Sequence, residues 1–230
     1  MSHRLTKGYA ALIIIFAVII ADQVMKFWVK THFYLGESVE ILPWFQLLFV
    51  ENNGRAFGME IGSKMFLSVF RVAVLIAGIW YLCKIRLNER FPLGFTVCIA
   101  LIVAGAAGNI IDGIFYGVIF NNPMPPEVAT LFPASGGYAP LLHGKVVDML
   151  YFPLFTITWP EWMPMVGGEQ FRFFQPVFNI ADAAISVGTI VIVLFYSRYF
   201  GEPVNKPVAD TDSDDGADNS TIRDHEDEAD

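Results

Sequence analysis

Long runs of apolar residues dominate this chain and are separated by shorter polar segments. A membrane-spanning helix needs about 20 consecutive, mostly apolar residues. Four stretches meet this requirement, at residues 8–28, 65–83, 92–111 and 177–199. The pattern therefore predicts four transmembrane helices, and each ionisable residue inside or beside them calls for a functional or structural explanation.

The first apolar stretch has a basic start, with Arg4 and Lys7, as a cleaved signal peptide also would. The apolar run continues through Asp22 to Trp28, however, without a clear small-x-small cleavage site. We therefore interpret this stretch as a retained helix.

The direction of the helices follows from the basic residues in their short flanks. These residues are densest at the N-terminus, between the second and third stretches, and after the fourth: Arg4, Lys7, Lys84, Arg86, Arg90, Arg198 and Lys206. Because cytoplasmic flanks carry the excess of Lys and Arg, we expect both termini and the 84–91 loop in the cytoplasm. Residues 29–64 and 112–176 then lie outside.

Both outer segments have compositions that favour ordered structure. Residues 33–59 mix aromatic and β-branched residues with Gly and Asn, which is typical of short strands and turns. Residues 117–176 are rich in Pro, Gly, Phe and Trp, and a connection of that length is often functional. The predicted fold is a mainly α membrane protein, with four transmembrane helices and a small β and loop cap on the outer, periplasmic side.

The composition supports this class. The chain is 54% hydrophobic and 17% charged, whereas soluble domains are about a quarter charged. The net charge of −8 comes from residues 201–230, which hold eleven Asp and Glu and leave 12 acidic and 13 basic groups in residues 1–200. We therefore expect one membrane domain over 1–200 and a disordered, acidic cytoplasmic tail over 201–230, a partner-binding tail being the alternative.

Other chemistries find little support in the residue patterns. Cys83 and Cys98 lie in or beside apolar runs and form neither a metal spacing nor a disulfide framework. The four histidines make no HExxH or other metal motif, so no metal site is predicted. The chain shows no phosphate-binding glycine loop and no basic nucleic-acid patch, so we expect no nucleic-acid partner.

The predicted helix directions bring polar residues together at one depth. Asp22 lies near the outer end of the first helix, and Asn109 and Asp112 lie at the outer end of the third. Asn179 and Asp182 lie at the outer start of the fourth. Three helices thus place carboxylates or amides on the same side of the membrane.

Local spacing sharpens this picture. Asn109 and Asp112 are three residues apart and share a helix face, where Gly105 and Gly108 allow a close backbone approach. On the fourth helix a polar stripe, expected to face protein or a wet cavity, contains Asn179, Asp182, Ser186 and Thr189. The remaining body aspartate, Asp148, follows in an apolar outer segment that should return it to the membrane surface.

Two of these aspartates also have structural interpretations. Asp22 could pair with Lys26, one helical turn later, and Asp112 could accept bonds from amides at its helix end. An intramembrane set of Asp, Asn, Ser and Thr could instead form the path of a proton- or cation-coupled small transporter. A third possibility is a non-catalytic assembly or lipid-binding membrane protein.

Five short blocks, in order along the body, resemble one known family. They contain Asp22-Gln23 with Lys26, Asn53-Gly54 with Ala56-Phe57-Gly58, Gly108-Asn109 with Asp112, Val146-Val147-Asp148, and Phe178-Asn179 with Ala181-Asp182 and Ile185. The chain resembles the lipoprotein signal peptidases, the type II signal peptidases of bacteria, which are membrane aspartic proteases. Each block alone is weak, but five in order beside four apolar stretches form a specific pattern.

The resemblance implies a catalytic pair and supporting residues. The pair corresponds to Asp148 and Asp182, and the supporting or substrate-binding residues are Asp22, Asn53, Gly54, Asn109, Asp112 and Asn179. The implied reaction removes signal peptides from diacylglyceryl-modified prolipoproteins by cutting just before the lipidated cysteine, at the outer face of the bacterial inner membrane. The resemblance also implies membrane lipid and globomycin-type peptide inhibitors as partners, and no cofactor.

The chain departs from the family in two places. The family usually has Arg after the third-helix aspartate, where this chain has Gly113; Arg55, Lys145 or Arg172 could replace it. The connection between the third and fourth helices is also longer than is typical, with additional sequence at about 118–142 and 153–172.

Depth and distance distinguish the alternatives. A transporter site belongs near the membrane midplane, often at broken helices, whereas these residues are predicted at one outer end. A protease needs the Asp148 and Asp182 carboxylates within reach of each other or of one shared water.

Overall fold

The computed structural model describes residues 2–52, 64–173 and 175–199. Its long helices are α1 (Ser2–His32), α2 (Lys64–Ile85), α3 (Leu93–Ile111) and α5 (Ile180–Phe195). A π-helical turn (Asp112–Tyr116) and the short helix α4 (Gly117–Ile119) continue α3, and a 3-10 turn (Ser197–Tyr199) follows α5. The strands are β1 (Ser38–Leu42), β2 (Phe45–Asn52), β3 (Val146–Tyr151), β4 (Phe155–Thr158), β5 (Gln170–Phe173) and β6 (Val177–Phe178).

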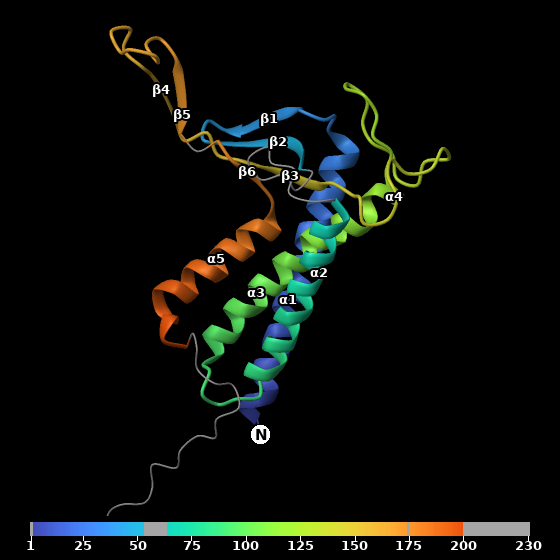
Figure 1. The fold of residues 1–230 in the computed structure, drawn as a ribbon, viewed down its shortest axis with the longest axis vertical. Helices are drawn as coiled ribbons and strands as arrows, with labels where there is room; N and C mark the ends of the chain where they lie inside the picture. The colour runs from blue at the N-terminus through green and yellow to red at the C-terminus, as the bar shows by residue number, and fades with distance from the viewer. Residues whose placement is uncertain (1, 53–63, 174, 200–230) are drawn as a thin grey trace, which may run out of the picture.

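Helix α3 is the central helix and packs against α1, α2 and α5 (Figure 1). Its glycines permit this close packing. A Cβ atom on Gly105 would lie 2.2 Å from the Ala181 carbonyl oxygen of α5, and one on Gly108 would lie 2.8 Å from Asp22 Oδ2 of α1. Side chains at these two positions would force the helices apart, as the sequence pattern indicated.

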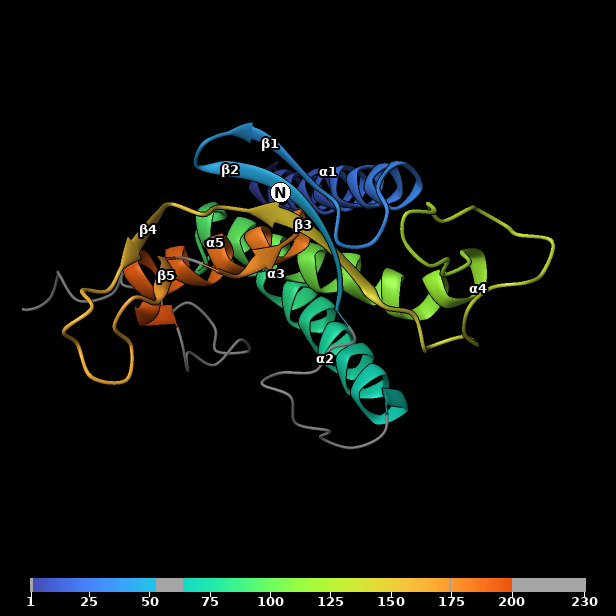
Figure 2. The same cartoon turned by 90° about the horizontal axis from the view of Figure 1, so that it is seen from above.

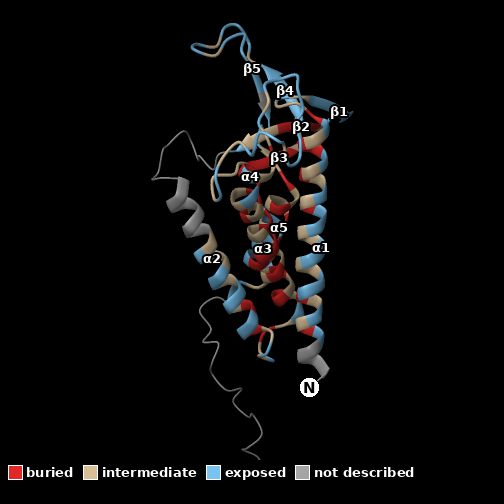
Figure 3. Cartoon of the chain, turned by 90° about the vertical axis from the view of Figure 1, so that its right-hand side faces the viewer, coloured by how far each residue is buried: buried red, intermediate tan, exposed pale blue. Residues whose placement is uncertain are grey.

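The long helices differ in length and exposure. Among the described residues, two stretches are long and apolar enough to cross a membrane, Thr6–His32 and Leu93–Ile119, while Val72–Ile85 and Ile180–Phe195 are shorter apolar helices. Large apolar side chains such as Ile13 and Phe16 project outward from α1, as expected for a lipid-facing surface. The buried positions concentrate on α3 and on β3 above it (Figure 3).

The fourth predicted span, residues 177–199, is longer than the helix that the structure contains there. Residues 177–178 form strand β6, helix α5 covers only Ile180–Phe195, and a 3-10 turn occupies Ser197–Tyr199. The start differs because the β6 backbone pairs with β3, through Leu150 with Phe178 and Tyr151 with Val177. Apolar content alone does not distinguish such a strand from the first turn of a helix.

A four-stranded antiparallel sheet, in the order β1-β2-β3-β6, lies across one end of the helices (Figures 1 and 2). Strand β3 is central, pairing Val50 of β2 with Asp148. A buried apolar cluster joins the sheet to the ends of α1 and α3 and includes Val29, Phe33, Phe49, Tyr116, Phe120, Val147 and Met149. The sheet thereby holds Asp148 beside the ends of three helices.

Strands β4 and β5 form a separate hairpin that projects beyond the sheet (Figure 1). Their side chains are largely exposed, including Phe155 and Ile157 on β4. This hairpin accounts for much of the additional sequence at 153–172, and the loop from 120 to 145 accounts for the other insertion.

Candidate active site

Asp182 is placed by the N-terminus of α5. Asn179 is the N-cap residue, and its side chain accepts a hydrogen bond from the Asp182 backbone N–H at 2.9 Å. In return, the Asn179 N–H donates to Asp182 Oδ2 at 3.4 Å, which completes a reciprocal capping box. This motif orients the Asp182 side chain through contacts within the first turn of α5 and its N-cap.

Asp148 is placed by the central strand β3 and is 4% exposed. Its Oδ1 accepts a hydrogen bond from Asn179 Nδ2 at 2.6 Å. The Asn52 side chain, from the end of β2, also hydrogen-bonds to this carboxylate. Asn179, the N-cap residue that bonds Asp182, therefore also bonds Asp148.

Asn109 of α3 completes the link between the two aspartates. Its Nδ2 donates to Asp182 Oδ1 at 2.7 Å, and its Oδ1 accepts from Asn179 Nδ2 at 3.1 Å. A continuous path of hydrogen bonds thus runs from Asp148 through Asn179 and Asn109 to Asp182. Neutral amides can position two carboxylates in this way without neutralising either of them.

Lys26 of α1 is a buried cation at the centre of a second layer. Its Nζ lies 2.8 Å from Asp22 Oδ2, 2.7 Å from Asp112 Oδ2 and 2.9 Å from Asn109 Oδ1. All the side-chain atoms of Lys26, Asp22 and Asp112 are shielded from solvent. Such an ion pair is retained only where every charge is satisfied.

The two supporting aspartates join elements that are distant in sequence. Asp22 Oδ1 accepts from the Ala181 backbone N–H at 2.9 Å, which ties α1 to the start of α5. Asp112 Oδ2 accepts from the Val147 N–H at 3.4 Å, which ties the end of α3 to β3. The pairing of Asp22 with Lys26 matches the expectation. The Asp112 carboxylate, in contrast, bonds to Lys26 and to the backbone of strand β3 rather than to amides at the end of its own helix.

Gln23 is a member of the network that sequence reasoning did not select. Its Nε2 donates to Asp112 Oδ1 at 2.9 Å and to the Gly108 carbonyl at 3.2 Å. Its Oε1 accepts from the Tyr116 hydroxyl at 3.1 Å. Its adjacency to Asp22 in the first sequence block was the available signal, but a single glutamine carries no chemistry that would select it alone.

The electrostatics of the pair suit acid–base chemistry. Burial raises the pKa of Asp148 to about 7, and the neighbouring Asp182 charge raises it in the same direction. The hydrogen bond from Asn179 and the charge of Lys26 lower the pKa but do not cancel this effect. The Asp148 carboxyl is therefore protonated at a higher pH than an ordinary aspartate, which suits a pair that shares one proton.

A cavity of about 250 Å³ lies beside Asp182. It is lined by Asn52, Val74, Ala106, Asn109, Ile110, Val146, Asp182 and Ile185. Ser186 and Thr189, the inner half of the expected polar stripe, are exposed. A larger cavity of about 380 Å³ lies between α1 and α2, lined by residues such as Gly8 and Arg86, and has no aspartate in its lining.

A second charged cluster lies between α1 and the sheet. Glu51 of β2 forms ion pairs with Lys30 and, at 2.7 Å, with Lys145 Nζ. Burial raises the pKa of Glu51, but the two ammonium groups outweigh this and hold it below its ordinary value. Lys145 was one candidate to replace the arginine that the family usually has at the position of Gly113, and it is paired with Glu51. Apart from its chain neighbours and the local helix backbone, no described atom lies within 4 Å of the place where a Cβ atom on Gly113 would be.

The structure brings together most of the sequence-predicted residues. Six of the eight belong to the described network: Asp22, Asn109, Asp112, Asp148, Asn179 and Asp182. Asn53 and Gly54 lie outside the described residues, as does Arg55. Asn52, which was not selected, is the described β2 asparagine that contacts Asp148.

The fold is an apolar helix bundle that holds two aspartates at one end, joined by hydrogen bonds through Asn179 and Asn109, and this arrangement is typical of a membrane enzyme that uses acid–base chemistry. The chain matches the family model described as "Signal peptidase (SPase) II" over residues 14–198, and it belongs to that family.

Several relatives are similar over most of their length. A "Lipoprotein signal peptidase" of Porphyromonas gingivalis is 49% identical over 85% of this chain and 86% of its own. Proteins of the same name from Amoebophilus asiaticus and Staphylococcus aureus are 35% and 30% identical, over 90% and 84% of this chain and 84% and 91% of theirs. A solved bacterial membrane enzyme is 25% identical, with a TM-score of 0.55 over 83% of this chain and 93% of its own. The chain is accordingly a bacterial membrane protein and a protease by family.

Proposed function

We propose that this protein is an aspartic endopeptidase that removes signal peptides from diacylglyceryl-modified prolipoproteins, with Asp148 and Asp182 as its catalytic pair. The observation that carries the proposal is the hydrogen-bonded path Asp148–Asn179–Asn109–Asp182, which ends at a cavity beside Asp182. The relatives are named lipoprotein signal peptidases, and these names support prolipoproteins as the substrate class.

The proposed chemistry uses the shared proton of the pair. Two carboxylates that face one site cannot both ionise cheaply, so one is protonated and the other ionised. The ionised member takes a proton from a water that attacks the scissile carbonyl carbon, and the protonated member donates to the carbonyl oxygen. The tetrahedral intermediate then collapses: the C–N bond breaks, the leaving nitrogen takes a proton from one carboxyl, and the other carboxylate takes a proton back from a hydroxyl as the carbonyl forms again, so the pair ends with one proton. The proton belongs to the pair, and roles are therefore not divided between Asp148 and Asp182. The resemblance implies no metal or organic cofactor.

The supporting residues orient this pair. Asn179 and Asn109 hold the carboxylates without adding charge, and the buried Asp22–Lys26–Asp112 cluster joins α1, α3, α5 and β3 around them. Asn53 and Gly54 are proposed as substrate-binding residues from the resemblance.

We place the site at the outer face of the inner membrane, with four spans and both termini in the cytoplasm. The basic flanks support this orientation, since Lys84, Arg86 and Arg90 lie at the end of the bundle opposite the sheet. The signal helix of the substrate would then lie in the bilayer, with its acyl chains in lipid and its cleavage point beside the aspartates. Globomycin-type peptides would compete for this site. The clustering of polar residues at one end does not favour a transporter.

The test is cleavage of a lipidated prolipoprotein by the full chain reconstituted in lipid. Asp148→Asn and Asp182→Asn should each lower the cleavage rate by about a thousandfold, because each removes one partner of the acid–base pair. Glu40→Gln is the matched control, a carboxylate-to-amide change at an exposed position on β1 of the same sheet. Cleavage by either aspartate variant at the rate of Glu40→Gln would overturn the assignment.

A further inference from the structure

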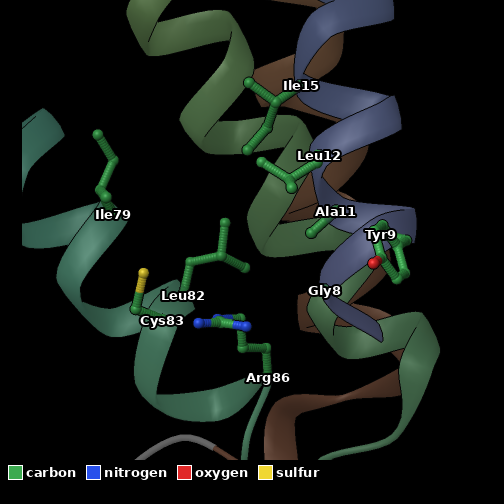
Figure 4. Close-up of a pocket in the computed structure, with 9 residues that line it drawn as sticks. All are labelled: Gly8, Tyr9, Ala11, Leu12, Ile15, Ile79, Leu82, Cys83 and Arg86. Atoms are coloured by element: carbon green, nitrogen blue, oxygen red, sulfur yellow. The ribbon is translucent and has the colours of Figure 1, made fainter. Parts of the chain in front are cut away.

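A cavity of about 380 Å³ lies between α1 and α2, and none of its lining residues takes part in the proposed reaction (Figure 4). Its walls are apolar, with Leu12 and Ile15 from α1 and Ile79 and Leu82 from α2. The Arg86 guanidinium lies at one end of this apolar space (Figure 4). We propose that this cavity binds an anionic phospholipid of the inner leaflet, with the phosphate on Arg86 and an acyl chain along the apolar walls.

The guanidinium is available for a ligand. Among the residues that the structure describes, none forms an ion pair or hydrogen bond with the Arg86 side chain. The planar guanidinium of arginine binds two oxygens of one oxyanion through two parallel hydrogen bonds. The two non-bridging oxygens of a phosphodiester satisfy this geometry.

The local backbone is built to hold Arg86 at this place. Lys7 is buried, and its Nζ donates to the carbonyl oxygens of Asn88 at 3.1 Å and Phe91 at 2.5 Å. These bonds fix the segment that follows α2 against α1. Gly8 keeps the space open, since a Cβ atom there would lie 3.3 Å from Arg86 Nη1.

The depth of the cavity matches a headgroup region. Gly8 precedes Asp22 by 14 residues on the continuous helix α1, which is about 21 Å at 1.5 Å per residue. The cavity therefore lies near the membrane boundary opposite the aspartates. Tyr9 and Trp80, both mostly exposed, lie near the same helix ends, as aromatic residues do at membrane interfaces.

The positive charge at the cavity favours an anionic lipid, rather than the signal peptide of a substrate, as its occupant. The end of a signal peptide that would reach this depth is its positively charged n-region. Arg86, Lys84 and Lys7 would repel it. An anionic headgroup has the opposite charge, and in the proposed orientation it belongs to the cytoplasmic leaflet, where polybasic segments gather anionic lipid.

The experiment places the full chain in nanodiscs of phosphatidylcholine doped with phosphatidylglycerol and measures the lipid retained after transfer to neutral detergent by native mass spectrometry. The wild-type chain should retain phosphatidylglycerol in preference to phosphatidylcholine. Arg86→Gln should lower this retention by roughly tenfold, the loss expected for one charge-assisted contact. Lys84→Gln is the matched control because it removes an exposed cation two residues away, outside the cavity lining.

A second variant tests occupancy of the cavity without changing charge. Gly8→Leu fills the space beside the Arg86 guanidinium, where even a Cβ atom would lie 3.3 Å from Nη1, and should also release phosphatidylglycerol. Cleavage activity reports that each variant is folded, and it should stay at the wild-type level because the aspartates lie at the other end of the bundle. Equal retention by wild type and Arg86→Gln, equal retention of both lipids, unchanged retention by Gly8→Leu, or loss of cleavage in both variants would overturn the proposal.

Discussion

Asp148→Asn should make the protein more stable at alkaline pH while it removes activity. The buried Asp148 carboxyl has a pKa of about 7 in the folded chain, against an ordinary value of 3.8. Between these values the folded state binds a proton that the unfolded state does not. The contribution of Asp148 to the free energy of unfolding therefore falls as pH rises from about 4, and it stops falling above about 7. Asparagine has no such titration.

The magnitude follows from the two pKa values. Their difference of about three corresponds to about 4 kcal/mol, at about 1.4 kcal/mol for each pKa unit. The substitution is otherwise mild, because the oxygen of the introduced amide can still accept the bond that Asn179 Nδ2 now gives Asp148 at 2.6 Å. In a chain of this size, 4 kcal/mol corresponds to about 10 °C in Tm.

The assay is thermal unfolding of the full chain in neutral detergent, with wild type and variant compared at pH 4 and at pH 8. The Tm difference should be near zero at pH 4 and should reach about 10 °C in favour of the variant at pH 8. Glu40→Gln, at an exposed carboxylate, should show no such trend. A Tm difference that is the same at both pH values would refute the reasoning, because it would mean that Asp148 titrates normally.

Two other substitutions test the buried charges. Lys26→Met should cost about 3–5 kcal/mol of stability, because it leaves two buried carboxylates without their cation; a wild-type Tm for this variant would contradict the assigned ion pairs. Glu51→Gln should cost about 3 kcal/mol at pH 7 by leaving Lys30 and Lys145 without a counter-charge. Because the pKa of Glu51 is lowered, its stabilisation is present above its ordinary value of 4.5 and is lost as pH falls through the folded value, so unfolding curves of the two proteins should converge in acid.

The sequence determined the membrane class, the resemblance to the family and the choice of the aspartates. Apolar stretches of about 20 residues need no tertiary information to be recognised, and alternating helix direction alone places Asp22, Asp112 and Asp182 at one depth. The capping box from Asn179 to Asp182 is also local, since its residues are three apart.

Only the tertiary structure decided how these residues are connected. Lys26 bonds partners on two helices, Asn52 of β2 contacts Asp148, and Arg86 lies at a cavity formed by two helices. The fourth helix is shorter than predicted because its first residues pair with β3. These outcomes depend on which side chains meet across elements that are distant in sequence, and hydrophobic periodicity reports burial but not the partner that a buried residue finds.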